Sequence, residues 1–172
     1  MEIWDIYDIN RIRTGGTIER GSEFRDNEFH VVVHVCVFSP DGKMIIQQRQ
    51  SFKEGWPGLW DVSAGGSALA GETSQEAAAR EVFEEIGYRA DLSNQRPFFT
   101  VNFETGFNDF YLVEDTVDIS QLVLQNEEVQ AVKWASKEEI LQMIKAEEFV
   151  PYHYGLIDIM FSMLHHRGAL RL

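Results

Sequence analysis

An apolar run rich in β-branched residues, FHVVVHVCVF at positions 29–38, is the feature that most constrains the fold of this chain. Such runs favour β-strands, and this one is followed by a turn sequence, SPDGK, and a second strand-like segment, MIIQQRQ at 44–50. The pattern predicts a β-hairpin. Residues 97–113 repeat it around the turn ETGFND, and EVQAVKW at 128–134 predicts a further strand. We expect these strands to share one mixed sheet.

Three helices are predicted from the residues at their ends. Residues 73–76 (TSQE) and 136–139 (SKEE) are capping boxes, in which the first side chain and the last each satisfy a free backbone N–H group. The first helix ends at Gly87, a residue type that tolerates a left-handed cap. The third begins near Pro151 and has apolar residues at helical spacing through Leu164. Helices before and between strands indicate a mixed sheet that is covered on both faces.

The chain is expected to form one domain over residues 1–172. It has no internal repeat, and its four prolines mark no linker. Residues 1–28 lie outside the predicted core and begin with EIWDIYDINRI, rich in tryptophan, tyrosine and isoleucine. We expect this N-terminal extension to pack on the domain or to form the contact of a homodimer.

Charge and cysteine content narrow the possible partners and the compartment. The formal net charge of −13 opposes binding to nucleic-acid polymers and to anionic membranes, so a small anionic substrate would need local cations. The single cysteine, Cys36, lies within the apolar run and is expected in the core. The first residues contain acids and no apolar stretch typical of a signal peptide, so we expect a cytoplasmic protein.

Glu81, Glu84 and Glu85 are spaced so that they share one face of the first helix, with Cβ atoms roughly 5–6 Å apart. Three carboxylates so placed repel, and protonation, solvation, cationic partners or a bound metal can lower the cost. A solvated acidic face is the ordinary interpretation of such a helix. Here the only cation inside the helix is Arg80, which could pair with Glu72 or Glu76. A hard cation such as Mg²⁺ would resolve the remaining repulsion.

The stretch from Gly66 to Tyr88 follows one spacing throughout. Five residues separate Gly66 from Glu72, and seven more precede Arg80, which begins the run REVFEEIGY. This stretch resembles the signature of the Nudix hydrolases, G-x5-E-x7-R-E-U-x-E-E-x-G-U, where U is a bulky hydrophobic residue. All fixed positions match; at Tyr88, aliphatic residues are commoner.

The resemblance implies an α/β/α sandwich that cleaves a diphosphate linked to another moiety, usually with Mg²⁺ and sometimes with Mn²⁺. By carry-over, three glutamates would ligate the metal: Glu81, Glu84 and Glu85. Of these, Glu81 is the one implied to activate water as well. Arg80 and Glu72 would brace the loop and the helix. Backbone carbonyls near Gly65 and Gly66 would complete the coordination.

Two alternatives to a hydrolase remain open. Residues 29–66, including WPGLWD, also resemble the isopentenyl-diphosphate isomerase branch of the superfamily. That branch places a catalytic cysteine and then a metal-binding histidine where this chain has Ala64 and Gly66, which counts against isomerisation. A nucleotide-sensing module that kept the fold without catalysis is the second alternative, although every acidic position of the motif is present.

Some candidate residues lie outside the motif. Glu127 and Glu128 precede a predicted strand, where a charged loop is the ordinary interpretation. The isomerase branch has an acidic metal ligand in a similar segment, and many Nudix hydrolases place a general base outside the motif. The resemblance therefore implies Glu128 as an additional acid or general base. Arg49 and Lys53 are candidates for binding substrate phosphate, although either could be a surface cation. Five aromatic residues could stack on a base or simply fill the core: Trp56, Trp60, Phe99, Phe103 and Phe110.

The remaining side chains do not identify the substrate. His30 and His34 share one face of a strand, and we favour structural roles for them because Mg²⁺ prefers oxygen ligands. Nucleoside diphosphates, nucleotide sugars, oxidised nucleotides and other small diphosphates all stay open as substrates.

Overall fold

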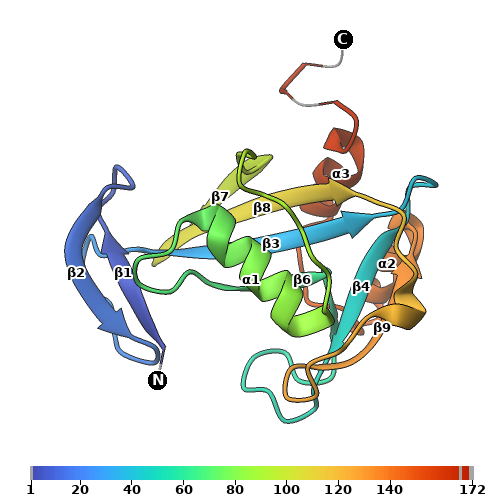
Figure 1. The fold of residues 1–172 in the computed structure, drawn as a ribbon, viewed down its shortest axis with the longest axis horizontal. Coiled ribbons are helices and arrows are strands. Elements are labelled where there is room, and N and C mark those ends of the chain that lie inside the picture. The colour runs from blue at the N-terminus through green and yellow to red at the C-terminus, as the bar shows by residue number, and fades with distance from the viewer. Residues whose placement is uncertain (1, 167, 171–172) are drawn as a thin grey trace.

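The protein is an α/β structure in which a seven-stranded mixed sheet lies between helices (Figure 1), as predicted. The computed structural model describes residues 2–166 and 168–170. The strands are β1 (Ile3–Tyr7), β2 (Arg13–Glu19), β3 (His30–Phe38), β4 (Met44–Arg49), β5 (Trp60–Asp61), β6 (Ala64–Ser67), β7 (Phe99–Phe103), β8 (Gly106–Glu114) and β9 (Val129–Ala135). The helices are α1 (Ser74–Ile86), the 3₁₀ turn Ile119–Gln121, α2 (Lys137–Lys145) and α3 (Tyr154–Met163).

The strand β3 is the centre of the sheet. It runs parallel to β8 along its whole length and antiparallel to β6, while β7 extends the sheet beyond β8. The predicted hairpin of β3 and β4 is present, but these strands pair only at Phe38 and Met44. Beyond that point the buried Ser63 hydroxyl lies between them, accepting from Val37 N–H (2.8 Å) and donating to the Ile45 carbonyl (2.6 Å). The hairpin opens because β4 pairs instead with β5 and β9.

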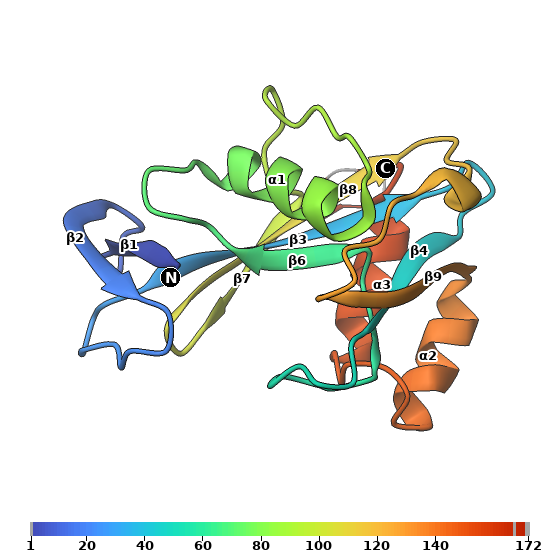
Figure 2. The same cartoon turned by 60° about the horizontal axis from the view of Figure 1, so that its bottom comes forward.

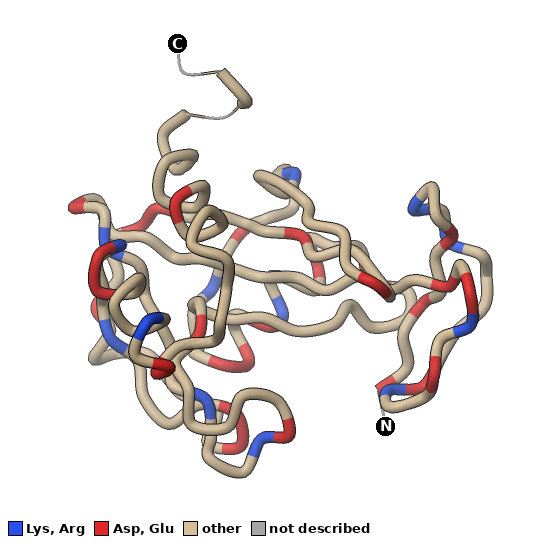
Figure 3. The backbone as a smooth tube through the Cα atoms, turned by 180° about the vertical axis from the view of Figure 1, so that it is seen from behind, with Lys and Arg blue, Asp and Glu red and all other residues tan. Residues whose placement is uncertain are grey.

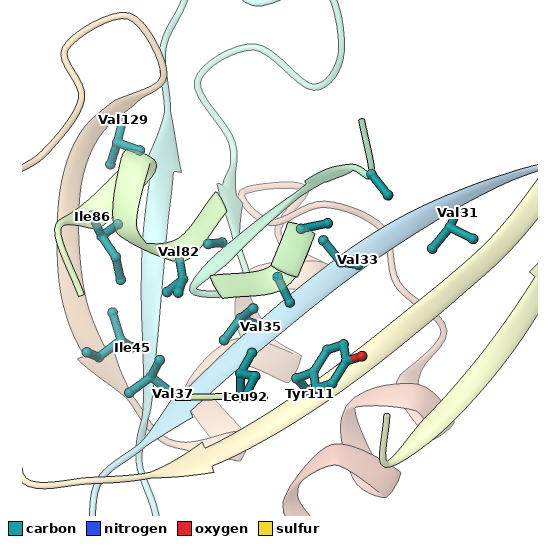
Figure 4. Close-up of a cluster of buried hydrophobic side chains, with 14 of the residues drawn as sticks. Val31, Val33, Val35, Val37, Ile45, Val82, Ile86, Leu92, Tyr111 and Val129 are labelled. Carbon is teal, nitrogen blue, oxygen red and sulfur yellow. The ribbon is translucent and has the colours of Figure 1, made fainter. Parts of the chain in front are cut away.

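Helices cover both faces of the sheet. Figure 2 shows α1 on one side and α2 and α3 on the other. Alternate residues of β3 pack into two hydrophobic cores. On the α1 side, beneath Val82 and Ile86, lie Val31, Val33, Val35 and Val37 (Figure 4). Cys36 packs on the side of α2 and α3. Burial on both faces explains why the run is apolar without alternation. Cys36 is a core residue, as expected.

The structure confirms the predicted first residues of two of the three helices. Both capping boxes are formed, Thr73 with Glu76 and Ser136 with Glu139, and α1 ends at Gly87 with φ of 73°. The third helix begins at Tyr154 rather than near Pro151. Its predicted start was wrong because the preceding backbone is extended and pairs with β5, Val150 N–H donating to the Trp60 carbonyl (2.8 Å).

The N-terminal extension forms a separate two-stranded antiparallel sheet, β1 with β2, beyond the end of the main sheet (Figure 1). It packs on the rest of the chain, for instance through Trp4, whose ring stacks on His30. A homodimer contact through this segment stays a prediction. Among the described residues, no helix has both the length and the apolar character needed to cross a bilayer.

Candidate active site

A polar cleft of about 260 Å³ lies beside the C-terminal half of α1. Its lining comes from segments far apart in the sequence: the N-terminal hairpin, the loop after β4, β6, α1 and the loop before β9. The cleft brings together these predicted site residues: Arg49, Lys53, Gly66, Arg80, Glu81, Glu84, Glu85 and Glu128. The fold therefore brings the motif glutamates together with an outside acid and with cations.

Helix α1 presents its glutamates to the cleft because its opposite face is buried. The apolar side packs on the sheet through Ala77, Ala78, Val82 and Ile86. The Glu81 and Glu84 side chains are 15% and 50% exposed. Glu85 lies deeper, and its Oε2 accepts hydrogen bonds from Gln47 Nε2 (2.8 Å) and from Gly65 N–H (3.2 Å). Glu85 thus joins α1 to the strands β4 and β6.

Arg80 contacts three glutamates of the charged cluster. Its guanidinium donates to both carboxylate oxygens of Glu72, at 2.7 and 2.9 Å, as the predicted bracing role requires. It also contacts Glu81 (2.8 Å) and Glu84 (3.1 Å), so these acids are not left unpaired, in contrast to the prediction. The alternative partner, Glu76, instead accepts hydrogen bonds from Thr73 in the helix cap.

Burial raises the pKa of two of the glutamates. Removal from water raises the pKa of Glu85 to about 8, and the nearby charge of Glu81 adds to the rise. Burial also raises the pKa of Glu81, against the opposing charge of Arg80, and the charges of Glu84 and Glu2 contribute to the rise. Buried like charges of this kind are stabilised by a bound cation.

Gly66 is required by space rather than by backbone conformation. A Cβ atom at this position would overlap the carboxylate of Glu81, and the φ angle of Gly66 is not in the left-handed region. At the neighbouring Gly65, a Cβ would come within 2.9 Å of His34 Nδ1. Gly66 therefore lets β6 pass directly against Glu81 of α1, and Gly65 lets it pass against His34 of β3.

The NUDIX domain model matches residues 28–157, which is most of the chain. The chain belongs to the Nudix family. An uncharacterized Nudix hydrolase of Listeria monocytogenes is 48% identical over 154 residues, which cover 90% of this chain and 91% of the relative. The resemblance inferred from the stretch Gly66 to Tyr88 is thereby confirmed.

Two further comparisons bear on the branch and on the fold. An isopentenyl-diphosphate Delta-isomerase of Salmonella arizonae is 28% identical over 143 residues, covering 78% of this chain and 77% of the relative. A crystal structure of a Deinococcus radiodurans protein superposes with a TM-score of 0.76 at 22% identity, covering 93% of this chain and 99% of that chain. The latter likeness shows a shared fold.

The Nudix glutamates have the chemistry that a hard divalent cation requires, and family members generally use divalent metal ions. Among residues 2–166 and 168–170, no three acidic, histidine or cysteine side chains are already arranged around one metal position. Arg80 donates to one oxygen of Glu81 and to one oxygen of Glu84, so it does not contact the second oxygen of either carboxylate. Because Glu85 is buried next to the charge of Glu81, the donor set fits a bound cation.

The acid and the cations outside the Nudix motif are connected to one another. Lys53 forms an ion pair with Glu128, which faces the cleft, whereas Glu127 is exposed. Arg49 lines the cleft but is held by Asp61 (3.3 Å) and by the carbonyl of Gly55 (2.9 Å). Lys53 therefore joins the loop after β4 to the loop before β9.

The aromatic candidates and the two histidines do not line the cleft: Trp56, Trp60, Phe99, Phe103, Phe110, His30 and His34. Phe103 packs edge-on against His30, so its position does not support contact with substrate. The ring of His30 stacks on Trp4, and its Nδ1 lies 3.0 Å from the Thr105 carbonyl. His34 stacks on Phe110, and burial lowers its pKa. These contacts indicate structural roles for both histidines.

Sequence reasoning missed the contribution of the N-terminal hairpin to the cleft. Glu2, Trp4 and Arg20 all line it, although they lie outside residues 28–157 matched by the family model. The aromatic composition of the first residues indicated that the segment packs on something. Nothing in the local pattern distinguishes Arg20 from an ordinary surface arginine.

Proposed function

We propose that this Nudix hydrolase cleaves a diphosphate linkage in a nucleoside diphosphate derivative or a related small diphosphate, with Mg²⁺ as cofactor and Mn²⁺ as an alternative. The observation that carries the proposal is the cleft itself. Its acids are suited to a hard cation, and its cations come from separate segments of the chain. In a protein with a net charge of −13, the bound metal together with these cations would supply the positive charge that an anionic substrate needs.

The proposed role of each residue follows from its position in the cleft. Glu81, Glu84 and Glu85 would hold the metal, with backbone carbonyls near Gly66. When bound, the metal would neutralise phosphate oxygens and lower the pKa of an attacking water. Glu81 is positioned by Arg80, which Glu72 holds in place on the other side.

The groups across the cleft complete the proposed mechanism. Glu128 lines the same cleft as the glutamate cluster and is proposed to accept a proton during hydrolysis. Lys53, its ion-pair partner, and Arg49 would bind phosphate oxygens. Arg49 ends β4 and pairs with Val129 of β9, and Lys53 lies in the loop between β4 and β5.

This chain lacks the catalytic thiol that the isomerase alternative requires. Ala64 stands at the position where that branch has its cysteine, and the only cysteine of the chain is Cys36. Cys36 is fully buried on the α2 and α3 side of the sheet, and burial raises its thiol pKa well above the usual range. Hydrolysis is the reaction that the residues of this cleft support.

A substrate panel tests the proposed function. The protein is incubated with nucleoside diphosphate derivatives, nucleotide sugars, oxidised nucleotides and isopentenyl diphosphate, with Mg²⁺, Mn²⁺ or EDTA, and products are followed by mass spectrometry. Metal-dependent cleavage of one class identifies the substrate. Allylic isomerisation without phosphate release would support the isomerase branch instead. Ligand-dependent thermal stabilisation without turnover would support a sensing module.

Replacing Glu128 by glutamine is expected to lower kcat roughly a hundredfold, because a glutamine cannot accept the proton. Glu127→Gln is the matched control, since Glu127 is adjacent in sequence but exposed, and it is expected to keep full turnover. Both variants should unfold at nearly the temperature of the unmodified protein. If kcat is unchanged in Glu128→Gln, this residue does not act in the reaction.

A further inference from the structure

The N-terminal hairpin forms one wall of the active-site cleft. Glu2, just before β1, and Arg20, just after the end of β2, both line it, together with Ser67 of β6 and the glutamates of α1. These two residues form an ion pair (2.8 Å) at the open end of the hairpin. Figure 3 shows basic and acidic positions adjoining there.

Contacts along its length hold this hairpin in place. The Trp4 ring stacks on His30 of β3, with ring centroids 4.7 Å apart and planes 9° from parallel. The Ile3 carbonyl accepts a hydrogen bond from Ala70 N–H (2.8 Å), in the loop between β6 and α1. At the other end, Arg11 forms a two-pronged ion pair with Asp109 of β8, whose carboxylate is fully buried. The position of Arg20 is therefore set by the fold, whereas its long side chain remains free to reorient.

Arg20 differs from the other cations of the cleft. The side chains of Arg49, Lys53 and Arg80 are 17–22% exposed, and each is held by a partner within the domain. The Arg20 side chain is 55% exposed, and among the described residues its one ion-pair partner is Glu2, which is itself 44% exposed. Exposed ion pairs of this kind contribute little to stability, so Arg20 is the cation most readily redirected to a ligand.

We propose that Arg20 binds a phosphate group of the substrate by exchanging Glu2 for phosphate oxygens. The inference rests on the proposed function only in taking a diphosphate as the ligand. The planar guanidinium group matches the geometry of phosphate and can donate two parallel hydrogen bonds. Glu2 competes for the same guanidinium and repels the phosphate. The hairpin thereby supplies a substrate-binding residue from outside the part of the chain that matches the family model.

The two partners of this ion pair are expected to have opposite effects on binding. The probe is methylenediphosphonate, a diphosphate analogue that cannot be hydrolysed at its bridge, titrated with Mg²⁺ into the full chain by calorimetry. Arg20→Ala is expected to raise Kd about tenfold, since a charge-assisted contact is lost. Glu2→Gln is expected to lower Kd about threefold, since a competing charge is removed. Arg20→Lys should recover part of the affinity, because lysine keeps the charge without the planar fork.

The control is Arg25→Ala, which removes an exposed cation of the same N-terminal segment that does not line the cleft. It is expected to leave Kd unchanged, which separates a local contact from a change in net charge. Thermal unfolding of each variant checks that the hairpin remains folded. A purely structural ion pair would make both Arg20→Ala and Glu2→Gln shift Kd in the same direction, or leave it unchanged, and either result overturns the proposal.

Failure of this inference can be told apart from failure of the proposed function. If the panel shows cleavage but Kd for methylenediphosphonate does not change in Arg20→Ala, the hydrolase assignment stands and the role of Arg20 does not. If no compound is cleaved but the opposite shifts are seen, Arg20 binds diphosphate in a protein that is not a hydrolase of the tested compounds. Absence of methylenediphosphonate binding to the unmodified protein with Mg²⁺ also overturns the proposal.

Discussion

Replacing Glu85 by glutamine is expected to abolish turnover and, in the absence of metal, to stabilise the folded protein at alkaline pH. Turnover should fall at least about a hundredfold, because the charged group proposed to hold the metal would be lost. The fold should persist, since a glutamine oxygen can accept the same hydrogen bonds from Gln47 and from Gly65 N–H. Loss of function with a gain in stability is the mark of a strained functional residue.

The direction of the stability change follows from the pKa of Glu85. Burial raises it from 4.5 to about 8 in the folded, metal-free protein. A carboxyl group whose folded pKa is raised favours folding below its unfolded pKa, and this contribution is lost as pH rises through the folded value. The metal-free protein should therefore lose up to roughly 1.4 kcal/mol of stability per pH unit from this group between these pKa values. Glu85→Gln removes that dependence.

Thermal unfolding in EDTA between pH 5 and pH 9 measures the effect, with pH values chosen to span the raised pKa of Glu85 at about 8. The unfolding temperature of Glu85→Gln should exceed that of the unmodified protein increasingly as pH rises. Glu84→Gln is the matched control, because Glu84 belongs to the same cluster but its side chain is half exposed. It should also abolish turnover, but with little change in stability. Full activity in both variants would refute the assignment of the metal site.

The parts of the fold that depend on local sequence could be predicted. The capping boxes, the end of α1 at Gly87 and the grouping of three glutamates on one helix face need only residues within a few positions of one another. The Nudix motif is predictable for the same reason. Its glycine and its glutamates belong to one β6–α1 segment, whose spacing survives in the linear sequence.

Features that depend on distant residues could not be predicted. The opening of the β3–β4 hairpin requires Ser63 and the pairing of β4 with β9, which lies far along the chain. The contacts of Arg80 with Glu81 and Glu84 depend on the side-chain rotamer that Arg80 adopts when it is hydrogen-bonded to Glu72. The position of the N-terminal hairpin beside the cleft depends on the ion pair between Arg11 and Asp109, which are 98 positions apart in the sequence. None of these contacts leaves a periodic or local pattern.

Replacing Gly66 by alanine is expected to lower turnover about a hundredfold while leaving stability nearly unchanged. The added Cβ would overlap the carboxylate of Glu81, which is the far end of a flexible side chain, so the carboxylate moves and the backbone does not have to. Displacing a reacting group by about 1 Å can cost a hundredfold in rate. Steady-state kinetics with Mg²⁺ and thermal unfolding in EDTA measure the two effects separately.

The matched control for Gly66→Ala is Gly155→Ala in α3, where a Cβ would meet open space. Alanine favours a helix over glycine, so this variant should be at least as stable as the unmodified protein, with unchanged turnover. If Gly66→Ala kept full activity, the close approach of β6 to Glu81 would not matter for catalysis. If it instead unfolded the protein, the glycine would serve packing of β6 against α1. Loss of turnover with a retained unfolding temperature is the one result that places Glu81 and Gly66 together in the working site.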